Sequence, residues 1–157
     1  GKKFTDDLIL EKLAMVKEAG IDRVKLYFMI GLPGESDEDI TAMTELCRRI
    51  IAETGQSLTL SINPFIPKPG TPWQDEIFSG KHTIRQKYEK IKRDMRTITK
   101  KTPQLRLTGI KEAETEFNLA WYGYNESREL AKNIEFGITK LPISNRETTG
   151  IELGRFM

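Results

Sequence analysis

The chain has 157 residues, of which 38% are hydrophobic and 31% are charged, and its net charge is +2. This composition is typical of one soluble globular domain and argues against disorder. No apolar run approaches the roughly 20 residues that a membrane-spanning helix needs, and the first residues lack the apolar segment of a signal peptide. We therefore expect a cytoplasmic protein that does not bind membranes.

The chain has one cysteine, Cys47, and one histidine, His82. A single cysteine cannot form an internal disulfide, and these two residues cannot make a His/Cys metal site by themselves. Cys47 lies in a helical apolar pattern, which favours an inert thiol in the core. His82 opens a basic helix and is interpreted as a solvated side chain.

The first elements in chain order are a helix and a strand. Thr5 is a candidate N-cap, an acidic first turn follows it, and apolar residues recur at helical spacing until Gly20 ends the helix. Residues 24–30 are almost all apolar and rich in β-forming types. Such a run indicates a strand that is covered on both faces, as in a parallel sheet.

A second helix and a second strand follow. Ser36 and Asp39 resemble a capping box, and apolar residues mark one helical face up to Gly55. Residues 58–63 then alternate between apolar and polar types, which predicts a strand with one apolar face and one polar face. Pro64 is expected to end the hydrogen-bond ladder of this strand.

The last part of the chain is predicted with less detail. Residues 81–101 have an apolar stripe at spacings of three and four and predict one long helix, and residues 105–109 predict a short strand. Residues 112–136 are expected to form one or two helices, carrying the apolar side chains Phe117, Leu119, Trp121 and Leu130. The composition of residues 137–150 indicates a loop or an extended tail.

This order of helices and strands with short connections indicates an α/β fold of parallel βα units. A barrel and an open doubly wound sheet both fit the pattern. Two or three strands are too few to close a barrel, which takes about eight. An open edge would have to be covered by a missing segment or by a second copy, so we expect a homo-oligomer.

The loop at residues 29–39 is the most informative stretch. Gly31 and Gly34 allow a sharp turn and close approach of a ligand, and the N–H groups of the next helix start are free. A cofactor loop and a simple tight turn are equally supported by this spacing. A phosphate loop is rejected, because GxxxxGK(S/T) is absent and carboxylates crowd the helix start; they are Glu35, Asp37, Glu38 and Asp39.

A second notable loop, at residues 63–73, contains four prolines after a strand end. Proline fixes φ, so this loop should be stiff although it lacks secondary structure. A rigid loop at the carboxyl end of a strand suits a binding site. Taken alone, the stretch would more often be an interdomain linker in the polyproline conformation.

Together the two loops resemble those of radical S-adenosylmethionine (radical SAM) enzymes, especially the cobalamin-domain-associated branch often labelled iron-sulfur oxidoreductases. Residues 25–40, KLYFMIGLPGESDEDI, look like the fifth barrel strand of that branch and the turn after it. Residues 63–72, NPFIPKPGTP, look like the end of its sixth strand. The resemblance implies that residues 1–110 are the C-terminal portion of a partial (βα) TIM-like barrel and that residues 111–157 are a helical or extended tail.

The resemblance also implies S-adenosylmethionine bound beside a 4Fe-4S cluster, with reductive cleavage to a 5′-deoxyadenosyl radical. The cluster loop of the family, CxxxCxxC, is absent here, and one cysteine cannot supply three thiolate ligands. We therefore expect a part of a longer polypeptide that is not catalytic alone, binds neither cofactor by itself and has the remaining N-terminal part of the parent chain as its partner.

The resemblance implies cofactor-binding positions in both loops. The positions expected to line the adenosine side are Ile30, Gly31, Gly34 and Glu35, and the backbone expected to meet the adenine edge lies around Ile62, Asn63 and Pro64. No residue is assigned to catalysis or to metal binding.

Strand alternation adds an independent expectation about the barrel lumen. Ser61 and Asn63 should point into the lumen, near the substrate, while Leu60 and Ile62 face the helices. In the first strand either Tyr27 and Met29 or Leu26 and Phe28 face inward, because the apolar sequence does not distinguish them.

Two other functions are weaker readings of the sequence. The helix at residues 81–101 is rich in Lys and Arg and could offer a basic face to RNA. Few aromatic residues alternate with these cations, so a solvated face is favoured over an RNA-binding one. The alternative class is an α/β interaction or assembly domain without a catalytic role, in which residues 31–35 form only a turn.

Overall fold

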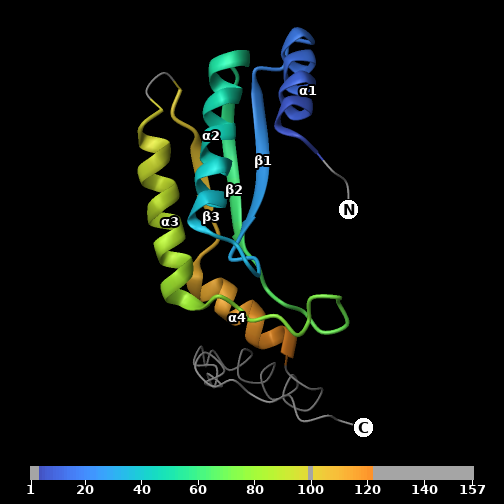
Figure 1. Cartoon of the computed structure of the whole chain (residues 1–157), viewed down its shortest axis with the longest axis vertical. Coiled ribbons are helices and arrows are strands. Elements are labelled where there is room, and N and C mark those ends of the chain that lie inside the picture. The colour runs from blue at the N-terminus through green and yellow to red at the C-terminus, as the bar shows by residue number, and fades with distance from the viewer. Residues whose placement is uncertain (1–3, 99–100, 122–157) are drawn as a thin grey trace, which may run out of the picture.

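The computed structural model describes residues 4–98 and 101–121. Helices and strands alternate along most of this region (Figure 1), and the elements are α1 (Asp6–Glu18), β1 (Arg23–Ile30), α2 (Asp37–Thr54), β2 (Ser57–Pro64), α3 (Gly80–Arg96), β3 (Gln104–Leu107) and α4 (Ile110–Trp121). The expected α/β class with parallel strands is confirmed. Residues 122–157, which include Leu130 and the predicted tail, lie outside the described residues.

Local capping signals position the first two helices. The Thr5 hydroxyl accepts a hydrogen bond from the backbone N–H of Leu8 at the start of α1. Ser36 and Asp39 form a reciprocal capping box at the start of α2, and Gly55 ends that helix in the left-handed conformation. These bounds agree with the capping pattern in the sequence.

The three strands form one parallel sheet in the order β1-β2-β3. The register pairs Tyr27 with Ser61 and Met29 with Asn63, and it pairs Ser61 with Arg106. Strands that are neighbours in sequence are therefore neighbours in the sheet, as successive βα units predict.

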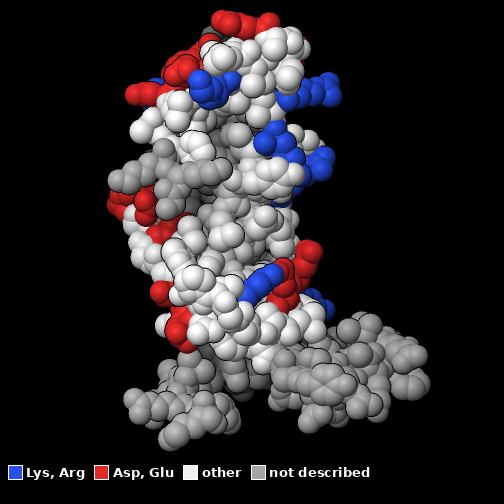
Figure 2. Space-filling view, turned by 90° about the vertical axis from the view of Figure 1, so that its right-hand side faces the viewer, with Lys and Arg blue, Asp and Glu red and all other residues white. Residues whose placement is uncertain are grey.

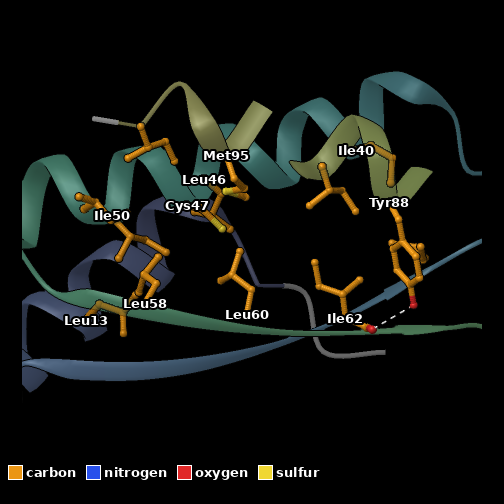
Figure 3. Packing of buried hydrophobic residues seen from close by; sticks show 14 of the residues in the cluster. Leu13, Ile40, Leu46, Cys47, Ile50, Leu58, Leu60, Ile62, Tyr88 and Met95 are labelled. Atoms are coloured by element: carbon orange, nitrogen blue, oxygen red, sulfur yellow. Dashed lines mark hydrogen bonds between the residues drawn. The ribbon is translucent and has the colours of Figure 1, made fainter. Parts of the chain in front are cut away.

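The hydrophobic core lies between one face of this sheet and the helices α1, α2 and α3 (Figure 3). Leu58, Leu60 and Ile62 project from β2 into a cluster that includes Leu13 of α1, residues of α2 and Met95 of α3. Each fully buried side chain of this size contributes about 1.5–3 kcal/mol. The core therefore fixes which face of the sheet the helices cover.

The predicted long helix is shorter than expected. α3 ends at Arg96 and not at Lys101, and its last turn is tightened: the backbone N–H of Thr97 donates to the carbonyl of Asp94, and that of Ile98 donates to the carbonyl of Met95. Pro103 follows and disfavours helical conformation in the residue before it. The third strand is also shorter than residues 105–109, since it covers Gln104–Leu107.

The fourth helix lies across the carboxyl ends of the strands (Figure 1). It begins at Ile110, and its Ala113 is fully buried. No helix in the described part of the chain is both long and apolar enough to cross a membrane.

Candidate functional site

The two loops singled out in the sequence emerge side by side at the carboxyl ends of β1 and β2 (Figure 1). The backbone N–H of Phe65 donates to the carbonyl of Ile30 at 2.7 Å, which joins the two strand ends. The Ser79 hydroxyl, which lies after the second loop and directly before α3, donates to the carbonyl of Gly31 at 2.9 Å. In parallel sheets this edge is where ligand sites form.

The turn after β1 is stabilised by hydrogen bonds between its own residues and by a buried ion pair. Gly31 and Gly34 adopt φ values of 74° and 78°, and the N–H of Glu35 donates to the carbonyl of Leu32 at 3.0 Å. The Glu35 carboxylate turns back to accept the N–H of Gly31 at 2.7 Å. It also forms an ion pair with Lys87 of α3 at 2.6 Å, and both side chains are almost fully buried. The Glu35 carboxylate is therefore part of the turn itself.

The two glycines have different surroundings. A Cβ on Gly31 would lie 2.8 Å from the Ser79 hydroxyl oxygen, so that side is occupied by protein. A Cβ on Gly34 would meet nothing within 4 Å. Gly34 is therefore the position in this turn where a ligand can approach the backbone without displacing a side chain.

The start of α2 is acidic, as the sequence indicates. The backbone N–H of Ser36 and then its hydroxyl lower the pKa of Asp39. A hydrogen bond from its own backbone and then the Ser36 side chain lower the pKa of Glu38. Both side chains are exposed. Anionic carboxylates thus occupy this helix start, which agrees with the rejection of a phosphate loop.

The proline-rich loop is packed against α4 and differs in this respect from a free linker. The indole N–H of Trp121 donates to the carbonyl of Pro67 at 2.9 Å. Lys68 forms an ion pair with Glu116 at 2.7 Å. The segment between this loop and α3 adds Phe78, whose ring stacks on that of Phe117 of α4 with 5.0 Å between the centroids.

The side of the sheet opposite the helices is open, and the burial pattern settles which residues it carries. In β2, Leu60 and Ile62 are fully buried, while Asn63 is exposed and Ser61 is partly exposed, as alternation predicts. In β1, Tyr27 and Met29 belong to this open face, since they are 69% and 50% exposed. The choice that the sequence left open is thereby resolved.

A small polar network joins the open face to the strand ends. The Thr108 hydroxyl donates to the side-chain oxygen of Asn63 at 2.6 Å. The Tyr88 hydroxyl donates to the carbonyl of Thr108 at 2.9 Å and makes a longer bond to that of Ile62 at 3.4 Å. Burial raises the pKa of Tyr88 to about 12, and the charge of Glu112 adds to this shift. Tyr88 therefore remains a hydrogen-bond donor over the physiological pH range.

The structure places the remaining predicted positions in the core. Ile30 and Ile62 have no exposed surface, and Gly31 and Pro64 are buried. Gly34 and Asn63 are the exposed members of the predicted set, with Ser61 partly exposed between the strands. Any ligand at these strand ends would meet these three residues first.

Lys87, Ser79 and Thr108 were missed by the sequence reasoning although they hold the site together. Lys87 had one signal, because it lies between Ile84 and Ile91 on the apolar stripe of α3. A lone cation on such a stripe usually has a buried partner. Ser79 and Thr108 are small polar residues in connecting segments and carry no comparable signal.

Cys47 is buried and does not resemble a metal ligand. It has no exposed surface, and burial raises the pKa of its thiol to about 12. His82 is exposed, as expected. Within residues 4–98 and 101–121 no group of three or more His, Cys, Asp or Glu side chains could hold a metal ion.

An uncharacterized protein of the archaeon Methanocaldococcus jannaschii is 36% identical to this chain over 88 residues. These residues make up 55% of the chain and 20% of the relative, so the chain matches about a fifth of that protein's length. No family model matches the chain, and no solved structure matches it. The resemblance to radical SAM enzymes therefore rests on the two loop motifs.

Proposed function

We propose that this chain is part of a radical SAM iron-sulfur oxidoreductase and contributes one side of its S-adenosylmethionine pocket. The observation that carries the proposal is the meeting of the two motif loops at one edge of a parallel sheet, joined by the bond from Phe65 to Ile30. Loops that are about thirty residues apart in sequence thus border one site. Their placement is that of ligand-binding loops in βα barrels.

The strand order and the helix positions support the partial TIM-like barrel over the doubly wound alternative. A doubly wound sheet reverses its strand order at a switch point and has helices on both faces. Here the order is sequential, and α1, α2 and α3 share one hydrophobic core on one face of the sheet. In a barrel the open face, with Ser61 and Asn63, would be the lumen.

The residues present suit contact with S-adenosylmethionine but not ligation of the iron-sulfur cluster. Gly34 leaves room beside the backbone, and Asn63 and Ser61 offer polar groups on the open face. Cys47 is buried and protonated and does not fit an iron ligand. In the proposal, the three cysteines of the cluster and the remaining strands belong to the N-terminal part of the parent chain, and the cluster supplies the electron that cleaves S-adenosylmethionine.

The test is a calorimetric titration with S-adenosylmethionine of this chain and of the parent protein with its cluster reconstituted. We expect millimolar or absent binding to the chain alone and micromolar binding with reductive cleavage by the parent. Gly34→Ala in the parent should weaken binding at least about tenfold, because the new methyl group narrows the ligand's approach.

Gly20→Ala is the matched control for this substitution. Gly20 also has a positive φ, 86°, and a Cβ there would also meet nothing within 4 Å, but it precedes β1 at the opposite end of the strand. Gly20→Ala should change the affinity of the parent for S-adenosylmethionine by less than about twofold. If the reconstituted parent does not bind S-adenosylmethionine, the proposal fails.

That failure would favour the second candidate, an α/β assembly domain. Exposed apolar side chains support this candidate: Tyr27 and Met29 lie on the open face, and Ile77, between the second loop and α3, is 85% exposed. Contiguous exposed apolar surface marks contact sites. Sedimentation of this chain over a range of concentrations would reveal a homo-oligomer, in which a second copy covers the open face.

A further inference from the structure

The open face of the sheet has an unusual balance of charge. Its strand residues include cations and neutral polar groups but no Asp or Glu, and they are Arg23, Lys25, Tyr27, Met29, Ser57, Thr59, Ser61, Asn63, Gln104 and Arg106. Figure 2 shows the molecule from the side: in its upper half, Lys and Arg without Asp or Glu lie along the right-hand margin, whereas Asp and Glu lie at the top and on the left, with further Lys and Arg among them. The open face is therefore suited to a negatively charged group.

Arg106 is the cation on this face that best suits an anionic ligand. The register places Tyr27, Ser61 and Arg106 in one row across the three strands. Adjacent strands are about 4.8 Å apart, so this row spans roughly 10 Å, with Ser61 in its middle. Arg106 is exposed, and its guanidinium has no ion-pair or hydrogen-bond partner within the described part of the chain.

Asn63 adds a second directed donor. Its side-chain oxygen accepts the Thr108 hydroxyl at 2.6 Å, which leaves the amide N–H groups to point elsewhere. Ser61 precedes Asn63 by two residues on β2 and pairs with Arg106 of β3, and its hydroxyl has no partner among the residues that the structure describes. Guanidinium, hydroxyl and amide thus offer donors to one region, and no Asp or Glu of the three strands lies on this face to accept them.

We propose that a donor cluster on this face, defined as Ser61, Asn63 and Arg106, binds the carboxylate or phosphate group of a small anionic substrate. The Arg106 guanidinium matches two oxygens of such a group bidentately. Tyr27 and Met29, in β1, supply apolar surface for the organic part of the molecule. The inference deepens the proposed function, on which it rests for the identity of the anion as a substrate.

The test is an amide-resolved NMR titration of this chain with inorganic phosphate and, separately, with succinate, at ionic strength held constant with sodium chloride. We expect saturable shifts of the amides of β2 and β3 and of the Arg106 side-chain N–H. The tighter-binding anion identifies which of the two groups, phosphate or carboxylate, the donor cluster prefers.

Arg106→Gln should weaken that binding about tenfold or more, because a charge-assisted hydrogen bond is lost. Arg85→Gln is the matched control: it removes the same charge from an exposed position on α3 and should change the affinity less than about twofold. Arg106→Lys keeps the charge without the bidentate geometry and should give an intermediate affinity.

Equal weakening by Arg106→Gln and Arg85→Gln would overturn the inference, and so would shifts that spread over the basic residues of α3. Saturable binding of a single-stranded oligonucleotide that phosphate does not compete away would assign the face to RNA. If the anion binds as expected while the parent fails to bind S-adenosylmethionine, the anion site remains and the proposed function is lost. If the parent binds S-adenosylmethionine but Arg106→Gln does not weaken anion binding, the inference fails and the proposed function remains.

Discussion

The ammonium group of Lys87 lies 2.6 Å from the carboxylate of Glu35, and both side chains are more than 90% buried. The same carboxylate accepts the N–H of Gly31 at 2.7 Å. This ion pair connects α3 to the turn between β1 and α2, so the helix that follows the second loop also fixes the shape of the first. A substitution at Lys87 should therefore alter the candidate site without touching a ligand.

Lys87→Met should destabilise the protein by about 3–5 kcal/mol, because Glu35 would be left as a buried, unpaired charge. Lys87→Met combined with Glu35→Gln should recover most of the loss, since the amide can still accept the N–H of Gly31. Urea unfolding measures the change. Lys92→Met is the control: Lys92 pairs with Glu89 at the exposed surface of the same helix and its loss should cost less than about 1 kcal/mol. Equal costs for the two lysines would contradict the role of the buried pair.

Gly31→Ala should be more destabilising than Gly34→Ala. Both glycines have a positive φ, so alanine costs about 1–2 kcal/mol at either position. At Gly31 the new methyl group would also overlap the Ser79 hydroxyl at 2.8 Å, which should add about 1–3 kcal/mol. Thermal or urea unfolding of the two variants decides this. A Ser79→Gly background should reduce the difference, and two variants of equal stability would argue against the close approach of these residues.

Trp121→Phe should loosen the second loop without unfolding the sheet. The substitution keeps an aromatic ring but removes the bond to the carbonyl of Pro67, at a cost of about 1 kcal/mol. Limited proteolysis after Lys68 should become faster, while the main unfolding transition changes little. Trp73→Phe is the control, because Trp73 is half-exposed and contacts Phe65 by its ring. Proteolysis unaffected by Trp121→Phe would show that other contacts hold the loop.

Much of the fold was predictable because its signals are local. The caps at Thr5, Ser36 and Gly55 involve residues within four positions of one another, so sequence spacing identifies them. Alternation in β2 likewise identified which side chains face the helices. In β1 the sequence is almost uniformly apolar, and only the exposure of its side chains in the folded chain determined that Tyr27 lies on the open face.

The candidate site was less predictable because its contacts join distant segments. Ser79 and Gly31 are 48 residues apart, and Thr108 and Asn63 are 45 apart. No spacing rule connects such pairs. Glu35 illustrates the limit: its place in the motif suggested a position at the ligand, whereas its carboxylate is bound to Lys87 from another helix. The open face could be inferred from alternation, but the isolation of Arg106 on it required the register of β3.

The buried thiol of Cys47 should make stability fall at alkaline pH. Burial raises the pKa of Cys47 to about 12 from an ordinary value of 9.0, which we take for the unfolded chain. Below pH 9 the thiol is protonated in both states and contributes no difference. Between pH 9 and 12 the unfolded chain ionises and the folded protein does not, so the free energy of unfolding decreases as pH rises.

This loss should reach about 3 kcal/mol at pH 11, and the raised pKa of Tyr88 should add about 1 kcal/mol. Urea unfolding under reducing conditions at pH 8 and pH 11 measures the total. Cys47→Ala should lower the free energy of unfolding at pH 8, because it leaves a small cavity. Between pH 8 and pH 11, however, the free energy of unfolding of this variant should decrease by about 3 kcal/mol less than that of the unmodified protein. Parallel losses in the two proteins would mean that the Cys47 thiol reaches solvent and ionises in the folded state.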